Sequence, residues 1–305
     1  MILNHVMSSD ISSGIFSDLI AYSRQYSDDG VEIKVSNKPI VGCDVYHYHR
    51  PHLETSLLRN AVVTVHHDLN DDDKWHLFEN FEKQYRQAAK VICLNTIQQS
   101  ILNDKGIKNT VVIPHGFNQH IFTAENKPVR DVVNLGVVSK RYGRKVKGEA
   151  LLYDLMKRLN RDSVCFTFVG KDRTQDCWKA RDLGYKAEVF ERLPYKVFGS
   201  LYQSLDALLV PSIFEGGPAN VPEAISTGTP LIAKPVGMIP DYLDESRGIF
   251  LTGNPDVDAR NINRYAKDKE YQESIKFEAY LNAHSAMTWE QVTKKQFSLY
   301  QELVK

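Results

Sequence analysis

The sequence predicts an α/β protein built from two doubly wound parallel sheets, each in a domain of its own. Three observations support this prediction. Short β-branched runs alternate with helical stretches, the alternation restarts after the polar segment 123–131, and 305 residues that are 42% hydrophobic suffice for two cores. A linker is expected at 124–131, which gives domains 1–125 and 130–287.

The expected elements follow from the spacing of apolar residues and from turn signals. Strands of the first domain are expected at 1–6, 31–35, 44–48, 62–66, 91–94 and 111–113, and those of the second at 132–138, 164–169, 187–190, 207–210, 230–233 and 248–251. Helices are expected at 12–26, 73–89, 96–104, 148–160, 195–204, 221–227, 258–268 and 288–304. Because each strand is followed by a helical or polar stretch, the strands are expected to run parallel.

Composition excludes several classes of protein. Lys plus Arg and Asp plus Glu both number 38, so no net charge draws the chain to nucleic acid or to an anionic membrane. The four cysteines form no CxxC pair, which favours a reducing compartment over a zinc site or a disulfide framework. The N-terminus lacks the basic start of a signal peptide, and no apolar run approaches about 18 residues. A cytoplasmic protein is expected, with peripheral contact to a membrane as the remaining option.

The segment EGGPANVPEA places Glu215 and Glu223 at an E-x7-E spacing after the strand expected at 207–210. Ligands of open parallel sheets bind outside the carboxyl ends of the strands. Glycines allow the backbone to approach a ligand closely, and Pro222 suits the first turn of a helix whose N-terminus attracts phosphate. Carboxylates on either side of that anion site can accept hydrogen bonds from neutral hydroxyls. A nucleotide sugar presents hydroxyls, diphosphate and hydroxyls in that order.

With this segment the chain resembles the family-four glycosyltransferases of the GT-B fold, whose signature is E-x7-E before a small-residue helix and a TPLIA-like strand. Further segments match that family in the same order: VVTVHHD (62–68), NTIQQSIL (95–102), VVIPHGFN (111–118), FVGK (168–171), LDALLVPS (205–212), PLIAKPVGMIPDYL (230–243) and TWEQV (288–292). The resemblance covers nearly the whole chain. It implies two Rossmann-like domains facing across a cleft, with a C-terminal helix at 288–305 that packs back on the first domain.

The same resemblance implies roles for the residues of this segment. Glu223 would bind ribose hydroxyls, and Glu215 would bind the donor sugar near its reacting carbon, as a catalytic residue. The remaining donor-binding residues implied here are Gly216, Gly217, Pro218, Ala219, Asn220 and Val221, together with Gly170 in FVGK. Without this context, Glu215 would be read as a residue of a solvated loop and Glu223 as a favourable helix start.

A basic loop follows the strand expected at 132–138. Five cations lie within the eight residues 140–147. In the resembling family one Arg and one Lys of this loop grip the donor diphosphate and stabilise the leaving group. Lys147, which precedes Gly148, matches the Lys, and Arg141 is the preferred Arg, with Lys140 and Arg144 as competing candidates. A solvated charge run and a nucleic-acid patch are the alternative interpretations.

Histidines gather at the strand ends of the first domain. The resemblance places His66 against the donor sugar as a catalytic residue, with His67 and Asp68 on the acceptor side. The spacings of His47 and His49 match no metal motif, so packing or hydrogen bonding at a strand end is expected for both, and no metal site is expected. Ser13 and Gly14 stand where the family has a glycine-rich loop, and a cleft role and a helix cap are equally supported for them.

The sequence therefore predicts a retaining, metal-independent glycosyltransferase that uses a UDP- or GDP-sugar as co-substrate and needs no cofactor. The leaving diphosphate would accept the acceptor's proton, so catalysis would rest on positioning and electrostatics. The DxD strings at 71–73 and 256–258 are expected to be solvated loops. Two alternatives stay open: a catalytically silent nucleotide-sugar-binding protein, and a glycoside hydrolase that uses Glu215 and Glu223. The acceptor, whether a glycan, a lipid-linked group or another hydroxyl, is not determined, and neither are the sugar nor the base.

Overall fold

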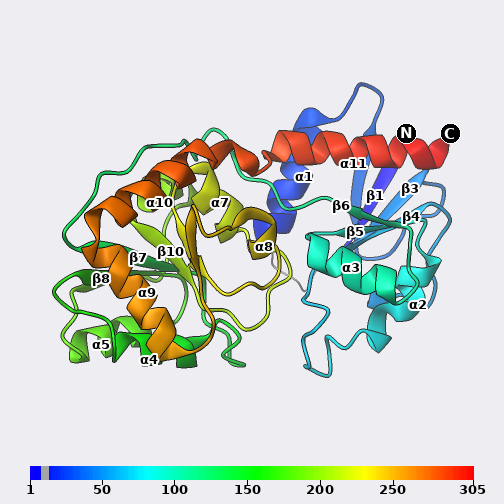
Figure 1. The fold of residues 1–305 in the computed structure, drawn as a ribbon. Helices are drawn as coiled ribbons and strands as arrows, with labels where there is room; N and C mark the ends of the chain where they lie inside the picture. The colour runs from blue at the N-terminus through cyan, green and yellow to red at the C-terminus, as the bar shows by residue number, and fades with distance from the viewer. Residues whose placement is uncertain (8–13) are drawn as a thin grey trace. The chain divides into compact units, whose positions relative to one another are not determined.

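The computed structural model describes residues 1–7 and 14–305, which form two compact units (Figure 1). Unit 1 contains residues 1–116, 215–219 and 287–305, and unit 2 contains residues 117–214 and 220–286.

The division falls at Gly116 and Phe117, earlier than the linker expected at 124–131. Phe122 packs into a hydrophobic core of unit 2. Lys127 is buried and donates to the carbonyl oxygen of Tyr202 at 2.8 Å. The polar segment is therefore anchored on unit 2, because it supplies both an apolar side chain and a buried cation to that unit.

Unit 1 is built on a six-stranded sheet in which all neighbouring strands are parallel. Its order is β2 (Glu32–Ser36), β1 (Ile2–Val6), β3 (Val45–Tyr48), β4 (Ala61–Val65), β5 (Lys90–Cys93) and β6 (Thr110–Val112). The helices of the unit are α1 (Gly14–Tyr26), η1 (Pro51–Leu53), α2 (Glu79–Gln87), α3 (Thr96–Asp104) and α11 (Trp289–Val304). Side chains of α1 and α11 share one core with the sheet, and those of α2 and α3 share the other.

The C-terminal helix α11 belongs to unit 1 and runs beside α1 and the strands in Figure 1. A reciprocal capping box of Thr288 and Gln291 begins it, a device that contributes about 1 kcal/mol. Trp289, Phe297 and Tyr300 are buried in the core shared with the sheet. The sequence end is thus fixed to the first half of the chain by apolar side chains at helical spacing.

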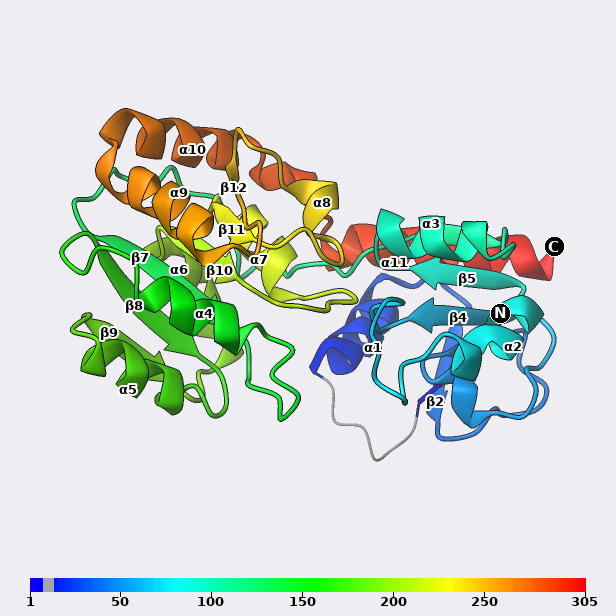
Figure 2. The same cartoon turned by 60° about the horizontal axis from the view of Figure 1, so that its bottom comes forward.

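Unit 2 contains a second parallel sheet of six strands. Its order is β12 (Gly248–Phe250), β11 (Leu231–Ala233), β10 (Ala207–Val210), β7 (Val133–Val138), β8 (Val164–Val169) and β9 (Ala187–Phe190). The helices are α4 (Glu149–Met156), α5 (Thr174–Asp182), η2 (Tyr195–Val197), α6 (Phe198–Ser204), α7 (Asn220–Ser226), α8 (Ile239–Tyr242), α9 (Pro255–Lys267), α10 (Lys269–Leu281) and η3 (Ala283–Ser285). One core receives α4, α5, α9 and α10, which Figure 2 shows with α9 beside α10, and the other receives α6, α7 and α8.

Several expected elements differ from the structure. The helices α5, α8 and α10 were not expected, since their sequences are polar or short. The helix expected at 73–89 begins only at Glu79, because Asp71 and Asp73 accept backbone N–H groups two residues ahead and form turns. The expectation that both DxD strings are solvated is wrong: Asp71 and Asp258 are buried, and Asp258 accepts the N–H groups of 252 and 253.

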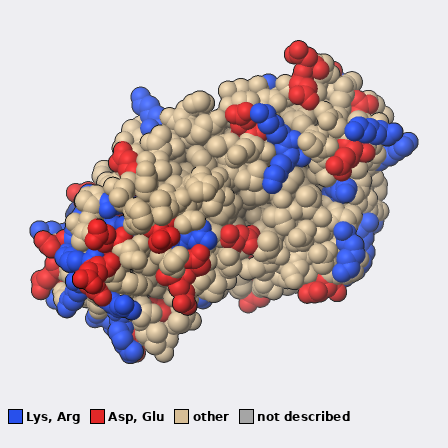
Figure 3. Space-filling model, turned by 45° about the horizontal axis from the view of Figure 1, so that its top comes forward, with Lys and Arg blue, Asp and Glu red and all other residues tan. Residues whose placement is uncertain are grey.

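Charged side chains of both signs lie on the surface that Figure 3 draws. Figure 3 shows Lys and Arg side chains intermixed with Asp and Glu on the face that it draws. Within residues 1–7 and 14–305, no helix has the length and hydrophobicity needed to cross a bilayer.

Candidate functional site

The two glutamates of the E-x7-E segment fall in different units. Residues 215–219 cluster with unit 1, whereas α7, which carries Glu223, lies in unit 2. Both glutamate side chains are buried, with 8% of Glu215 and 7% of Glu223 exposed. The alternative interpretations, in which Glu215 lies in a solvated loop and Glu223 only favours a helix start, therefore do not describe these buried side chains. Each unit thus holds one half of the motif at the carboxyl ends of its strands.

In unit 1 the backbone of 215–217 is anchored by three side chains from three different loops. Asp68, after β4, accepts the backbone N–H group of Glu215 at 3.2 Å. Asn95, after β5, donates its side-chain amide to the carbonyl of Gly216 at 2.7 Å. His115, after β6, donates to the carbonyl of Gly217 at 2.8 Å. The segment is therefore held at the carboxyl edge of the sheet by groups that sequence reasoning did not assign, apart from Asp68.

The glycines of this segment are required by close packing. A Cβ on Gly216 would lie 2.5 Å from the carbonyl oxygen of His66. A Cβ on Gly217 would lie 2.6 Å from a methyl carbon of Leu94. Both glycines thus bring the backbone against the loops that end β4 and β5. Pro218 is buried and Ala219 half-buried in the same unit.

A row of imidazoles crosses the carboxyl edge of the sheet in unit 1. His5 Nδ1 lies 3.0 Å from His49 Nε2, and His49 Nδ1 lies 3.2 Å from His66 Nε2. His5 lies near the carboxyl end of β1, and His49 and His66 directly follow β3 and β4. All three lie on the face that also carries Leu3 and Val45, because side chains of one face recur every second residue. Toward the carboxyl ends of these strands the apolar face of the sheet therefore becomes polar.

The row has a defined direction of hydrogen bonding. Burial is the main cause that lowers the pKa of each histidine, to about 3 for His5 and well below the ordinary 6.5 for His49 and His66. Neutral imidazoles carry one N–H each, so both hydrogen bonds must point the same way. Within residues 1–7 and 14–305, His5 Nε2 is buried without a hydrogen-bond partner, and an unused acceptor is tolerated better than an orphaned donor. We infer that protons point from His5 to His49 to His66, which leaves His66 with its N–H at Nδ1.

His47 lies beside this row but is bonded elsewhere. Its Nδ1 is 2.8 Å from the hydroxyl of Tyr300 and its Nε2 is 2.7 Å from that of Thr64. Ligand nitrogens of His5, His47 and His49 lie within 4.8 Å of one another, so the trio was tested as a metal site. The rings of His47 and His49 are stacked at 4.3 Å and both nitrogens of His47 already face hydroxyls. This arrangement fits the hydrogen bonding expected at a strand end better than it fits metal ligation.

Two of the residues expected on the acceptor side, His67 and Asp68, lie in the segment that follows β4. His67 is 8% exposed and its ring lies 4.2 Å from that of Phe81, while Asp68 accepts the amide of Asn70 as well as that of Glu215. Gly14 begins α1. Ser13 lies outside the described residues.

In unit 2, Glu223 is held by two phenols. Tyr195 donates to one carboxylate oxygen at 2.8 Å and Tyr202 to the other at 2.9 Å. Burial raises the pKa of Tyr202 well above its ordinary value, and the neighbouring carboxylate raises it further. Sequence reasoning missed both tyrosines, since nothing in their local pattern marks them. Removal of Glu223 would leave the buried phenol of Tyr202 without this acceptor.

The helix α7 that carries Glu223 has only seven residues. Asn220 donates its side-chain amide to the carbonyl of Val138 at 2.8 Å, which fixes the start of α7 against the end of β7, and Val221 is fully buried. A helix this short has a small dipole, so phosphate binding by its N-terminus, expected from the sequence, receives little support.

The basic loop joins β7 to α4. Lys140 and Lys147 approach the ring of Tyr142 from 4.7 Å and 5.5 Å, so these two expected phosphate ligands gather around one aromatic side chain. Gly148 has a φ of 76°, and a Cβ there would collide with the carbonyl of Pro211. The K-G element of the sequence is thus explained by a left-handed turn at the helix start.

Arg141 has a structural partner that the sequence did not reveal. Its guanidinium is 13% exposed and contacts Asp176 and the hydroxyl of Tyr153. Arg173, fully buried and not assigned from the sequence, binds the other oxygen of Asp176 at 2.6 Å and the carbonyl of Ser139 at 2.7 Å. Arg141 and Arg173 therefore anchor the base of the basic loop on α5.

The other two donor-binding candidates of unit 2 differ in kind. Gly170 has a φ of 128°, and a Cβ there would lie 2.6 Å from the carbonyl carbon of Ser139, so close packing explains this glycine. Arg144 lies in the exposed tip of the basic loop.

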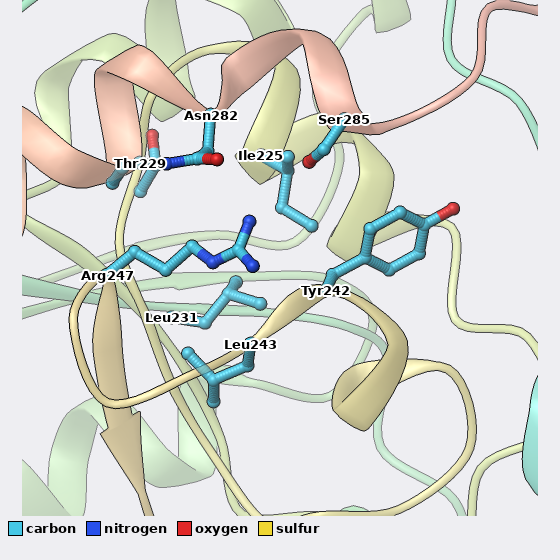
Figure 4. A pocket seen from close by; sticks show the side chains of 9 residues that line it. Ile225, Thr229, Leu231, Tyr242, Leu243, Arg247, Asn282 and Ser285 are labelled. Atoms are coloured by element: carbon cyan, nitrogen blue, oxygen red, sulfur yellow. The ribbon is translucent and has the colours of Figure 1, made fainter.

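One cavity of unit 2 lies away from these residues. Figure 4 shows the guanidinium of Arg247 directed into it, between Ile225 and Leu231. Its volume is only about 10 Å³, room for roughly one water molecule, and Arg247 is paired with Asp244 at 2.6 Å. It holds neither glutamate of the motif, so we do not assign the site to it.

The chain is similar to known proteins in sequence and fold. The family model described as "Glycosyl transferases group 1" matches residues 124–281. An uncharacterised glycosyltransferase of Methanocaldococcus jannaschii is 26% identical over 160 residues, 50% of this chain and 40% of that protein. A D-inositol 3-phosphate glycosyltransferase of Corynebacterium aurimucosum is 26% identical over 215 residues, 62% of this chain and 51% of that protein. The chain thus spans about half the length of these curated relatives, or less.

Solved structures are similar over nearly the full chain. Sucrose-phosphate synthase from Thermosynechococcus elongatus superposes with a TM-score of 0.79 at 15% identity, covering 99% of both chains. HepE from Anabaena, solved with UDP-glucose, superposes with a TM-score of 0.75 at 16% identity, covering 99% of this chain and 100% of that one. These neighbours have the GT-B fold, so the predicted class of two Rossmann-like domains is confirmed. The chain belongs to the group 1 glycosyltransferase family.

Proposed function

We propose that this chain transfers a sugar from a nucleoside-diphosphate sugar to a hydroxyl acceptor, with retention of anomeric configuration. The observation that carries the proposal is the buried E-x7-E motif at the carboxyl ends of parallel strands: two phenols hold the carboxylate of Glu223, and Asp68 holds the backbone amide of Glu215. Because HepE was solved with UDP-glucose, a UDP-sugar is the first donor to test.

In the proposed reaction each residue acts by binding or by electrostatics. Glu215 accepts hydrogen bonds from the donor sugar and stabilises the positive charge that grows at the anomeric carbon. His66 donates Nδ1–H to a sugar oxygen, since its Nε2 is used by His49. Lys147 and Lys140 neutralise the leaving diphosphate, and Glu223 accepts hydrogen bonds from ribose hydroxyls.

The proton of the acceptor hydroxyl passes to the departing diphosphate as the new glycosidic bond forms and the sugar–phosphate bond breaks. No side chain is then required as general base. A His66 that carries its proton at Nδ1 and has a lowered pKa suits a neutral donor better than a base. We further propose that the reaction is independent of a protein-bound metal.

The hydrolase alternative is less well supported. Both carboxylate oxygens of Glu223 accept hydrogen bonds from phenols, which fix the orientation of this side chain and suit a binding role better than that of a mobile nucleophile. The silent binding protein remains distinguishable only by activity. Release of UDP from UDP-sugars, with and without a panel of hydroxyl acceptors and with and without EDTA, tests the proposal. Binding of UDP without turnover on any acceptor would favour the silent binder, and complete loss of activity in EDTA would overturn metal independence.

A further inference from the structure

Unit 1 contains an arginine without a counter-charge, next to the expected acceptor side. Arg50 follows the end of β3 and is only partly exposed. Within residues 1–7 and 14–305 its guanidinium makes no hydrogen bond or ion pair, and its Nε is buried without a partner. Burial lowers the pKa of this guanidinium from its ordinary value, opposed by the phenol of Tyr85. A partly desolvated cation without a counter-charge costs stability, so its retention requires a reason.

Two imidazole nitrogens beside Arg50 are also unpartnered. His52 Nδ1 and His67 Nε2 are buried without a hydrogen bond in the part of the chain that the structure describes. Their rings lie 4.5 Å and 4.2 Å from that of Phe81, so one aromatic ring of α2 supports both. Arg50 lies two residues before His52 in the sequence, and its positive charge contributes to the lowered pKa of both imidazoles, after burial as the largest cause. Three unsatisfied nitrogens in one place are unusual for a folded interior.

The nearest acidic group of this region is already occupied. Asp71 binds His76 Nδ1 at 2.8 Å, and the ring of His76 lies 5.6 Å from that of His67. Asp71 raises the pKa of His67, but burial and the neighbouring His76 and Arg50 lower it more, to about 3. Among residues 1–7 and 14–305, Arg50 therefore has no carboxylate as ion-pair partner.

We propose that Arg50, His52 and His67 bind a tetrahedral oxyanion, the phosphate group of a phosphorylated acceptor. An arginine fork and two imidazole N–H groups from separate segments offer donors in several directions, which suits a phosphate with three free oxygens better than a planar carboxylate. His67 lies next to His66 in the sequence, so a phosphate held here would place its acceptor beside the proposed sugar site. The identification of the anion with an acceptor rests on the proposed function, whereas the anion site itself does not.

The test uses the full chain, with UDP present at saturation so that any diphosphate site is filled. Inorganic phosphate is titrated calorimetrically against wild type and Arg50→Gln, with chloride replacing phosphate at equal ionic strength. We expect wild type to bind phosphate and Arg50→Gln to bind it at least tenfold more weakly, since a charge-assisted pair is lost. His52→Phe, which keeps a ring against Phe81 but removes the nitrogens, should weaken phosphate binding several-fold.

Matched variants separate this site from others. Arg59→Gln removes an exposed arginine of the same unit and should leave phosphate affinity unchanged. Arg50→Gln should retain wild-type affinity for UDP, so failure of UDP to bind any variant would count against the proposed function and not against the anion site. Equal phosphate affinity in wild type and Arg50→Gln, or equal losses in Arg50→Gln and Arg59→Gln, would overturn the site.

Thermal unfolding supplies an independent readout. Arg50→Gln relieves an unpaired charge, so without phosphate its melting temperature should equal or exceed that of wild type, while phosphate should stabilise only the wild type. A large loss of stability in Arg50→Gln would assign Arg50 a structural role and refute the proposal. Acetate at the same ionic strength should stabilise much less than phosphate. An equal effect of acetate would refute the preference for a tetrahedral anion.

Discussion

The two units differ in the polar groups that line the carboxyl ends of their strands. In unit 1 the carboxyl edge of the sheet is lined by neutral imidazoles that bond one another, as in the row of His5, His49 and His66. In unit 2 the corresponding edge is lined by charges that pair, as in Arg141, Asp176 and Arg173. A parallel sheet therefore does not dictate the electrostatics of its edge. Neutral donors suit sugar hydroxyls and cations suit a diphosphate, which is the division of labour that we propose.

The largest effect is expected from Glu215→Gln. The change keeps size and hydrogen bonding but removes the negative charge near the reacting carbon, so kcat should fall by about 10²–10³. Initial rates of UDP release at saturating donor measure it, with Glu245→Gln, an exposed glutamate of unit 2, as control. A fully active Glu215→Gln would show that the negative charge of Glu215 does not contribute to catalysis and would contradict its proposed role.

Acidification should destabilise unit 1 first. The pKa values of His5 and His115 are lowered to about 3 and about 4, chiefly by burial, so the unfolded chain binds more protons below its own value of 6.5. Their stabilising contribution is complete above about pH 6.5 and falls as the pH decreases, by about 2 kcal/mol per histidine at about pH 5. Hydrogen exchange should show faster opening of β1 and β3 at about pH 5, with β7 and β8 still protected. Equal loss of protection in both sheets would contradict this difference.

Substitution of Lys147 and of Arg141 in the basic loop should affect different properties, UDP binding and stability respectively. Lys147→Ala should weaken UDP binding by about tenfold or more with little change in melting temperature, because it removes a charge-assisted contact. Arg141→Ala should instead lower the melting temperature, because Asp176 is fully buried and loses one of its two guanidinium partners. Calorimetry with UDP and thermal unfolding measure both. If Arg141→Ala weakened UDP binding at unchanged stability, the diphosphate would be assigned to Arg141, as the sequence alone suggested.

Glu223 should combine both behaviours. Glu223→Ala should raise the KM for the donor, and it should cost about 1–3 kcal/mol of stability because the hydroxyl of buried Tyr202 loses its acceptor. Glu223→Gln retains one oxygen acceptor and should recover part of the stability. Thermal unfolding and donor kinetics of the two variants are compared. A destabilised Glu223→Ala with unchanged KM would limit Glu223 to a structural role.

The smallest effect is expected from the imidazole row. His49→Leu removes the donor that fixes the tautomer of His66, so kcat should fall by roughly tenfold, as for loss of one neutral hydrogen bond. His49→Asn, whose amide can occupy the position of Nδ1, should recover most of it. His47→Leu is the matched control, since His47 is equally buried but bonds Tyr300 and Thr64. Equal losses of kcat in His47→Leu and His49→Leu would show that the imidazole row stabilises the fold and does not orient His66 for catalysis.

The amino-acid pattern predicted the strands of both sheets and the position of the E-x7-E motif after β10. Period-two and β-branched patterns depend on neighbouring residues, so 133–138 and 164–169 were readable without a structure. The same holds for Glu215 and Glu223, whose spacing and glycines are local features. Family membership followed from such segments in their order.

Only the tertiary structure decided which polar groups are paired. Asp176 lies 35 residues from Arg141, so nothing local could show that this arginine is engaged. The assignment of 215–219 to unit 1 likewise depends on Asn95 and His115, which contact it from distant loops. Arg50 is the converse case: an arginine in a sequence carries no sign of lacking a partner. Pairing is a property of groups brought together by folding, and the local pattern that specifies strands and helices does not contain it.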